Sequence, residues 1–215
     1  MKAVIFDMDG VIIDSHSVAC QLLCDAANKF GCKLTIEEIK QWGSLSSRQF
    51  WKRVKDEWHL PHDISVLMNS YDEDREIELY KGMELISGVR SFLQEVKANQ
   101  LKTALATSAS KMRMNAVVDL FGLHSLFDEF ICDEEVSASK PDPQIFLLAS
   151  QKLSLQPSEC VVVEDSENGK IAAKRAGMRC LGFKGLPHVK ENMEGADIIF
   201  HSFHDLKIEH LKKLF

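Results

Sequence analysis

The sequence lacks any apolar run long enough to cross a membrane, because none of its apolar stretches approaches the ~18 residues that a spanning helix needs. The apolar start carries Asp7, Asp9 and Asp14 and has no small-residue cleavage site, so we do not expect a signal peptide. Internal repeats and low-complexity segments are also missing. These absences favour a globular cytoplasmic protein with no membrane partner, in line with its 45% hydrophobic and 27% charged residues.

An excess of positive charge is absent too, since 32 Asp and Glu residues outnumber 26 Lys and Arg residues. The formal net charge of −6 gives no support for a nucleic-acid partner. Two basic stretches, Lys111-Met112-Arg113 and Lys212-Lys213, are interpreted as solvated helix faces.

The six cysteines show no Cys-x-x-Cys spacing of the kind found in metal and redox sites. Three of them, Cys132, Cys160 and Cys180, fall in stretches that predict buried strands. We therefore expect reduced cysteines that pack in the core.

What the sequence does contain, close to its start, is a short apolar run, Ala3-Val4-Ile5-Phe6, followed by Asp7, Asp9 and Gly10. A run this short, bounded by a glycine, predicts a buried parallel strand, and ligands bind just beyond the carboxyl ends of such strands. Two carboxylates at about 4 Å would repel each other by roughly 1 to 4 kcal/mol, so we expect a positive group nearby. The alternative is that Asp7, Asp9 and Gly10 merely form a turn.

The stretch from 15 to 84 shows helical periodicity and no strand pattern, which predicts an inserted helical domain. The expected helices run from Ser15 to Gly31, from a capping box at Thr35 to about Gly43, from Ser46 to Trp58 and from Asp63 to Tyr80.

Strands and helices alternate over the rest of the chain, so residues 1–14 and 85–215 are expected to form one α/β domain. The expected strands are Thr103–Thr107, Glu129–Cys132, Cys160–Val163, Arg179–Phe183 and Ala196–Phe200. The expected helices are Val89–Asn99, Lys111–Phe121, Pro143–Leu153 with Asp142 as its cap, and Glu167–Ala176. This pattern predicts a Rossmann-like, doubly wound parallel sheet with an inserted all-helical cap.

Four short motifs follow one another along this alternation. They are Asp7-x-Asp9-Gly10-x-x-x-Asp14, Thr107-Ser108 after a strand, Lys140 before Pro141, and Glu164-Asp165 after a strand. In this order they resemble the haloacid dehalogenase-like hydrolase superfamily. The resemblance is greatest to the β-phosphoglucomutase and phosphoglycolate phosphatase branch, which inserts a helical cap after the first motif.

The resemblance implies a Mg²⁺-dependent phosphatase that acts on a small phosphorylated metabolite such as a sugar phosphate. It makes Asp7 the nucleophile that becomes an aspartyl-phosphate and Asp9 the general acid and base. It assigns Ser108, Ala109 and Lys140 to the transferring phosphoryl group. The hydroxyl of Ser108 has the alternative of capping the helix that starts near Lys111.

The same resemblance assigns Mg²⁺ to the Asp7 side chain, the Asp9 carbonyl and Asp165, with Glu164 close by. A hard cation with oxygen ligands suits such a set, and four acids face only one lysine, Lys140. We expect a dianionic phosphate to be repelled when the metal is missing.

The helical domain is expected to choose the substrate and to close over it. Its candidate contacts are His16, Trp42, Arg48 and Trp51, although both tryptophans also suit a core. Arg48 is the preferred candidate because its guanidinium can bind an anionic group, and His16 is the second.

Three other functions are open. Phosphomutases of this branch carry a cap histidine about nine residues after the signature glycine, where this chain reads Val18-Ala19-Cys20, so hydrolysis is favoured. Receiver-type signalling modules share some of these residue types but lack the Asp-x-Asp motif and the helical insertion. A protein that only binds a phosphate ester is the third. The presence of both Asp9 and Asp165 argues against a dehalogenase proper, because dehalogenases lack this acidic set. We expect a monomer.

Overall fold

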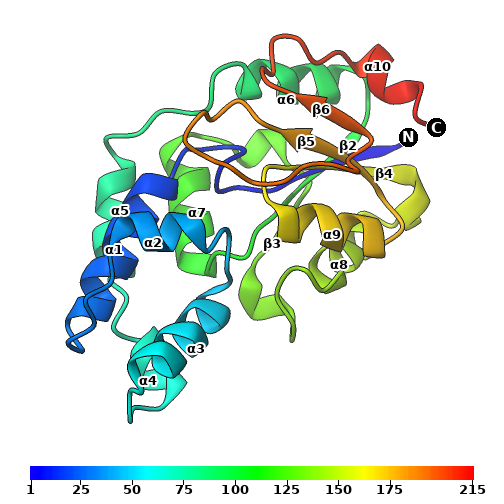
Figure 1. The fold of residues 1–215 in the computed structure, drawn as a ribbon. Coiled ribbons are helices and arrows are strands. Elements are labelled where there is room, and N and C mark those ends of the chain that lie inside the picture. Colours follow the sequence, from blue (N-terminus) through cyan, green and yellow to red (C-terminus); the bar gives the residue numbers. More distant parts are fainter. The chain divides into compact units, whose positions relative to one another are not determined.

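The computed structural model describes residues 1–215 and divides the chain into two compact units. One unit comprises Met1–Asp14 and Met83–Phe215, and the other is the single stretch Ser15–Gly82 (Figure 1). The chain therefore leaves the first unit after Asp14 and returns to it at Met83.

The first unit contains one six-stranded sheet in the order β3-β2-β1-β4-β5-β6, with every neighbouring pair parallel. The strands are β1 (Ala3–Phe6), β2 (Lys102–Ala106), β3 (Glu129–Ile131), β4 (Cys160–Glu164), β5 (Arg179–Phe183) and β6 (Ile198–Phe200). This is the predicted Rossmann-like fold, and the strand order reverses between β1 and β4.

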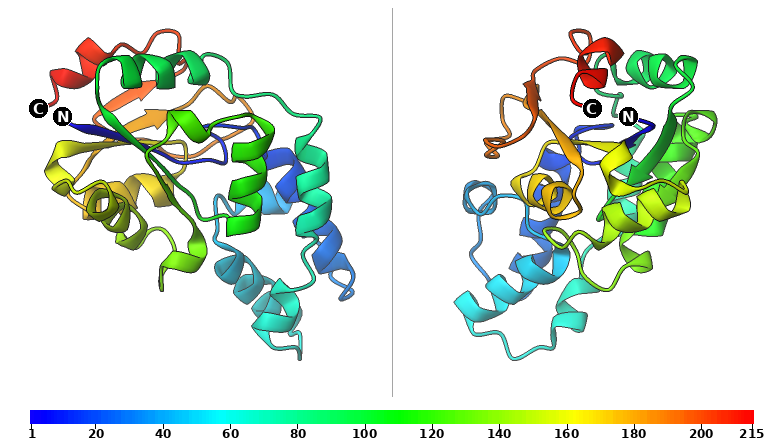
Figure 2. Two further views of the ribbon diagram at one scale, coloured as in Figure 1. Left: turned by 180° about the vertical axis from the view of Figure 1, so that it is seen from behind. Right: turned by 90° about the vertical axis from the view of Figure 1, so that its right-hand side faces the viewer.

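Helices cover both faces of this sheet (Figures 1 and 2). They are α6 (Val89–Ala98), α7 (Lys111–Leu120), α8 (Gln144–Lys152), α9 (Glu167–Arg175) and α10 (Ile208–Lys212), with short 3₁₀ turns η1 (His124–Leu126), η2 (Asp133–Glu135) and η3 (Pro157–Glu159). Because both faces are covered, β1 and β4 are buried along their whole length, which explains their unbroken apolar sequences.

Alternate residues of β1 point into two different cores. Ala3 and Ile5 belong to a cluster with Phe146 of α8 and Ala172 of α9. Phe6 faces the other way, where its ring meets those of Phe92 and Phe127 edge-on at 6.1 and 5.9 Å. Since β1 packs between two cores, the position of Asp7, which directly follows it, is well defined.

The second unit consists of helices only: α1 (His16–Asn28), α2 (Ile36–Gln41), α3 (Ser47–Trp58), α4 (Ile64–Met68) and α5 (Glu73–Tyr80). Phe50, Trp51 and Leu67 are at its centre. The capping box predicted at Thr35 is present, because the Thr35 hydroxyl accepts from the Glu38 N–H and the Glu38 carboxylate accepts from the Thr35 N–H.

One predicted helix, Asp63–Tyr80, is wrong, because the structure divides it into α4 and α5. At the break the Ser70 hydroxyl donates to the Leu67 carbonyl, and the Asp72 carboxylate accepts from the Arg75 N–H. Short polar side chains such as these compete with helix hydrogen bonds, so they favour helix ends over helix interiors.

Smaller differences occur at other helix ends. Pro143 occupies the cap position of α8, and the Asp142 carboxylate instead accepts from the Gln144 N–H at 3.0 Å. Helix α10 was not predicted. All six cysteines are unpaired, and none of the helices is both long and apolar enough to span a bilayer.

Candidate active site

The sheet brings two acidic motifs to the point where its strand order reverses. Asp7 directly follows β1, Glu164 is the last residue of β4, and Asp165 follows it. The two strands stay paired up to this point, since the Asp7 N–H donates to the Val163 carbonyl at 3.0 Å. A crevice at the carboxyl ends of the strands is where doubly wound sheets bind ligands.

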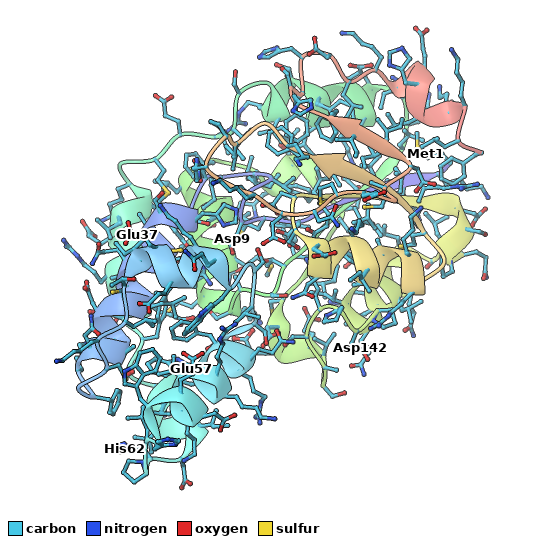
Figure 3. All side chains as sticks on the ribbon, viewed as in Figure 1. Met1, Asp9, Glu37, Glu57, His62 and Asp142 are labelled. Carbon is cyan, nitrogen blue, oxygen red and sulfur yellow. The ribbon has the colours of Figure 1, made fainter.

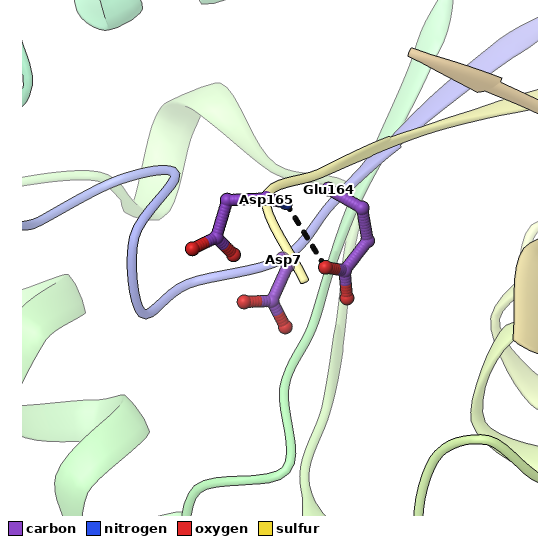
Figure 4. Close-up of side chains that lie close together, drawn as sticks. All are labelled: Asp7, Glu164 and Asp165. Atoms are coloured by element: carbon purple, nitrogen blue, oxygen red, sulfur yellow. Dashed lines mark hydrogen bonds between the residues drawn. The ribbon is translucent and has the colours of Figure 1, made fainter. Parts of the chain in front are cut away.

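The carboxylates of Asp7, Glu164 and Asp165 each offer an oxygen that lies within 4.8 Å of the other two (Figure 4). All three residues are buried, with exposed fractions of 7%, 1% and 3%. Buried acids this close repel one another strongly, so the cluster requires compensating positive charge.

Lys140 supplies part of that charge. Its ammonium lies 2.5 Å from Asp7 Oδ1 and 2.7 Å from Glu164 Oε1, and it also donates to the Ala106 carbonyl at 3.4 Å. The lysine therefore joins the ends of β2, β1 and β4, although it comes from the loop before α8. The sequence singled out Lys140, and the structure places it among the acids.

Burial and neighbouring charges shift the pKa values of Asp7 and Lys140. Burial raises the pKa of Asp7 well above its ordinary value, Glu164 and Asp165 raise it further, and Lys140 opposes them. Burial alone would lower the pKa of Lys140, but the charges of Asp7 and Glu164 outweigh it and raise that pKa, so the ammonium stays protonated.

The cluster fits a hard divalent cation. Three carboxylates against one ammonium leave a formal charge of −2, and carboxylate oxygen is the ligand type that Mg²⁺ prefers. A cation held there would also favour the ionised form of Asp7, because opposite charge stabilises a carboxylate.

Glu164 is held by several protein donors. Its Oε2 accepts from the main-chain N–H groups of Asp165 and Ser166, both at 3.0 Å, and from the Ser166 hydroxyl at 2.8 Å. Its Oε1 takes the bond from Lys140. These bonds fix the orientation of Glu164 and, through it, that of Lys140.

Asp9 lies on the turn after β1 (Figure 3), which Gly10 forms with a φ of +81°. Its carboxylate does not belong to the three-acid cluster. Instead, Arg113 Nη2 donates to Asp9 Oδ1 and Oδ2 at 3.3 and 3.2 Å. The Asp9 carboxylate is thus paired with Arg113 at the edge of the acidic cluster, and the Asp9 carbonyl is a candidate metal ligand.

Arg113 corrects the interpretation of Lys111-Met112-Arg113 as a solvated helix face, because its side chain is only 14% exposed and it pairs with Asp9. The sequence contained a signal that would have found it. Arg113 stands in the first turn of a helix that starts at the carboxyl edge of the sheet, directly after Thr107-Ser108.

The loop after β2 holds the residues expected to contact a phosphoryl group. The Thr107 hydroxyl accepts from the Ala109 N–H at 3.0 Å, and Ala109 is buried while Ser108 is exposed. The capping alternative for Ser108 is wrong, since Ser110 caps α7 by accepting from the Arg113 N–H. The Ser108 hydroxyl is therefore not committed to the helix end.

The candidates in the helical unit differ in exposure. Trp51 is fully buried and belongs to the core, whereas Trp42 is half-buried and stacks under the guanidinium of Arg53 at 4.2 Å. Arg48 is exposed in the first turn of α3, and His16 is half-buried at the start of α1. The structure thus removes Trp51 from the candidates and leaves Arg48 open to solvent within its own unit.

Comparison with known proteins identifies the family. A family model described as haloacid dehalogenase-like hydrolase matches residues 4–183, which contain all four motifs. The chain belongs to the haloacid dehalogenase-like hydrolase family. It is therefore an enzyme of the hydrolase class, and the resemblance seen in the four motifs is confirmed.

Relatives of known name include phosphatases and phosphomutases. The β-phosphoglucomutase of Bacillus subtilis is 30% identical over 222 residues, which cover 97% of this chain and 93% of that protein. The phosphorylated carbohydrates phosphatase of Thermotoga maritima is 29% identical over 178 residues, which cover 83% of this chain and 82% of that protein. The crystal structure of CbbY from Rhodobacter sphaeroides in complex with phosphate is 26% identical, with a TM-score of 0.83 over 96% of each chain.

Proposed function

We propose that this hydrolase is a Mg²⁺-dependent phosphatase that cleaves a small phosphate monoester, such as a sugar phosphate, through an aspartyl-phosphate on Asp7. The observation that carries the proposal is the buried group of Asp7, Glu164, Asp165 and Lys140 at the reversal of strand order. Relatives that act on phosphorylated carbohydrates and a relative with bound phosphate support the substrate class.

In the first half-reaction an oxygen of the Asp7 carboxylate forms a bond to phosphorus while the bond from phosphorus to the ester oxygen breaks. The departing alkoxide takes a proton from Asp9. In the second half-reaction Asp9 removes a proton from water, the water oxygen attacks phosphorus, and the bond to Asp7 breaks. Inorganic phosphate is released and both carboxyl groups return to their starting states.

Charge must be neutralised while the phosphoryl group moves. Lys140, which already contacts Asp7, and the hydroxyl and main-chain N–H of Ser108 are the candidates for binding its oxygens, while the neighbouring Ala109 N–H donates to the Thr107 hydroxyl. We propose that Asp7, Asp165, the Asp9 carbonyl and Glu164 hold Mg²⁺. When bound, the ion supplies positive charge that lets a dianionic ester approach the acids.

A phosphomutase is the second candidate, because one relative is a β-phosphoglucomutase. Such an enzyme returns the phosphoryl group to another hydroxyl of the sugar. The stretch Val18-Ala19-Cys20, where mutases of this branch have a histidine, favours release to water instead.

The proposal is tested by measuring phosphate release from a panel of sugar phosphates and from p-nitrophenyl phosphate. Each substrate is assayed with Mg²⁺, after thorough chelation, and after Mg²⁺ is restored. We expect release that chelation abolishes and Mg²⁺ restores. Activity that survived chelation would remove the metal assignment. Conversion of one sugar phosphate into an isomer without free phosphate would replace the phosphatase by the mutase.

A further inference from the structure

The contact between Arg113 and Asp9 is not explained by the mechanism above. One nitrogen of the guanidinium, Nη2, lies 3.2 and 3.3 Å from the two carboxylate oxygens. The side chains are 14% and 27% exposed, so the pair is largely shielded from water. Shielding matters, because ion pairs on an open surface contribute little while partly buried pairs orient their members.

Arg113 is itself well anchored. Its main-chain N–H donates to the Ser110 hydroxyl at 3.2 Å, which caps α7 and fixes the first turn of that helix. Helix α7 begins where the loop after β2 ends, at the same edge of the sheet as Asp7. The guanidinium therefore approaches Asp9 from a rigid element.

Asp9, by contrast, lies on a turn beside Gly10, whose positive φ any other residue would adopt at a cost. A general acid must reach the leaving oxygen to within about 2.6–3.2 Å, so a side chain on a turn benefits from a partner that limits its rotamers.

We propose that Arg113 is a positioning residue that orients the Asp9 carboxyl group for proton transfer. The inference rests on the proposed function, since it presumes that Asp9 is the acid and base. The geometry suits such a task. The contacts from Arg113 Nη2 at 3.2 and 3.3 Å reach both oxygens of the Asp9 carboxylate, and they are longer than the ~2.7–2.9 Å of a strong charge-assisted bond.

The test exploits the leaving group. An alkyl phosphate needs a proton as its alkoxide departs, whereas p-nitrophenolate is stable as an anion and needs none. The value of kcat/KM reports the steps up to formation of the phosphoenzyme and is insensitive to the second half-reaction. Arg113→Gln should lower kcat/KM on an alkyl sugar phosphate by about 10- to 100-fold, part of the ~10²–10⁴-fold worth of a positioned acid. On p-nitrophenyl phosphate it should change kcat/KM by less than about 3-fold.

A double-mutant cycle adds a second readout. Once Asp9→Asn has removed the acid, Arg113→Gln should cause no further loss on the alkyl ester, because nothing remains to be oriented. Arg113→Lys keeps one charged donor and should retain most of the activity. Arg90→Gln is the matched control: it removes another half-buried guanidinium, which donates to the Phe121 carbonyl at the far end of α7.

Each outcome is decisive. Equal losses on both esters, or losses that add to those of Asp9→Asn, would make Arg113 a ligand of the phosphoryl group or a structural residue and would overturn the inference. No loss on either ester would overturn it as well. If circular dichroism shows that Arg113→Gln does not fold, Arg113→Lys replaces it. Wild-type activity of Arg113→Lys on both esters then supports the inference, and an equal loss of activity on both esters overturns it. If the wild-type protein releases phosphate from neither ester, the proposed function itself fails and the inference falls with it.

Discussion

Asp7, the proposed nucleophile, lies in an unusual charge environment. It is held by Lys140 and lies beside two other acids, in a site where burial raises its pKa. A carboxylate attacks phosphorus only when ionised, and the contact from Lys140 opposes the effect of burial on the pKa of Asp7, so it favours the form that the proposed reaction needs.

The substitution Asp7→Asn tests this at the scale of one residue. An amide has nearly the same shape but no nucleophilic charge, so we expect no phosphoenzyme and no turnover. The fold should persist, because Lys140 keeps Glu164 as a partner. Intact-protein mass spectrometry after mixing with substrate, together with circular dichroism, measures both. Covalent phosphate recovered on the variant would contradict the assignment of the nucleophile.

At the scale of an element, the first turn of α9 after β4 has no room for a side chain at Gly169. A Cβ at Gly169 would lie 1.8 Å from Glu164 Oε1 and 1.9 Å from its Cδ, closer than any real contact. The Glu164 carboxylate cannot simply move aside, because Lys140, Asp165 and Ser166 all bind it. The helix thus requires glycine at this position.

Gly169→Ala should therefore displace Glu164 and with it Lys140. We expect kcat to fall by at least about 10-fold, since misplacing a group near the reacting atoms has large effects. The loss of one or two buried bonds should cost about 1–3 kcal/mol of unfolding free energy. The matched control is Gly82→Ala, where the new Cβ would meet the Leu79 carbonyl at an ordinary 3.7 Å. A fully active Gly169→Ala enzyme would show that the position of Glu164 is not critical.

Strands β5 and β6 are joined by an acid whose contribution depends on pH. Asp197 accepts from the Cys180 N–H, from Lys174 and from Arg179 at 2.7, 2.5 and 3.0 Å. Burial would raise the pKa of Asp197, but these donors outweigh it and hold the pKa below its ordinary value of 3.8. The stabilisation is thus complete above about pH 5 and is lost as the pH falls through the lowered pKa.

Asp197→Asn should reduce the free energy of unfolding at pH 7 by about 0.5–1.5 kcal/mol, because the partly buried Cys180 N–H and the exposed Lys174 and Arg179 side chains lose a charged acceptor. The difference in free energy of unfolding between the variant and the wild-type protein should become smaller as the pH is lowered below 4. Urea unfolding between pH 7 and pH 3.5 measures it, with the exposed Asp205→Asn as control. A difference that stayed constant over this range would show that the charge of Asp197 does not stabilise the fold.

At the scale of the whole molecule, the chain builds a catalytic α/β unit and interrupts it with a separate helical unit. The residues proposed to react all belong to the first unit, and the second has its own core around Trp51. The proposed function assigns the chemistry to the first unit, and the choice of substrate by the second unit is a prediction.

Arg48→Ala tests that division. We expect kcat/KM on the physiological sugar phosphate to fall by roughly 10- to 10³-fold, about 1.4–4 kcal/mol, because binding energy from a distal group aids orientation. On p-nitrophenyl phosphate, which has no distal group, the loss should be much smaller. Equal losses on both substrates would mean that Arg48 acts in the chemistry or the fold, and no loss would return it to the solvated surface.

The sequence alone was enough to locate the four family motifs and to predict the class of fold. A short apolar run that ends in acids marks a buried strand with Asp7 and Asp9 at its carboxyl end, and the resemblance of the four motifs to the family added Asp165 to the same site. Local signals also served well where they involved neighbours in the chain, as in the capping box at Thr35.

Tertiary structure decided what joins residues far apart in the chain. Lys140 contacts Asp7 across 133 positions, and Arg113 contacts Asp9 across 104. Sequence periodicity shows which face of an element is apolar, but such contacts depend on side-chain rotamers and on how the elements pack. For that reason the sequence predicted a solvated Arg113, and only the position of α7 next to the turn after β1 revealed Asp9 as its partner.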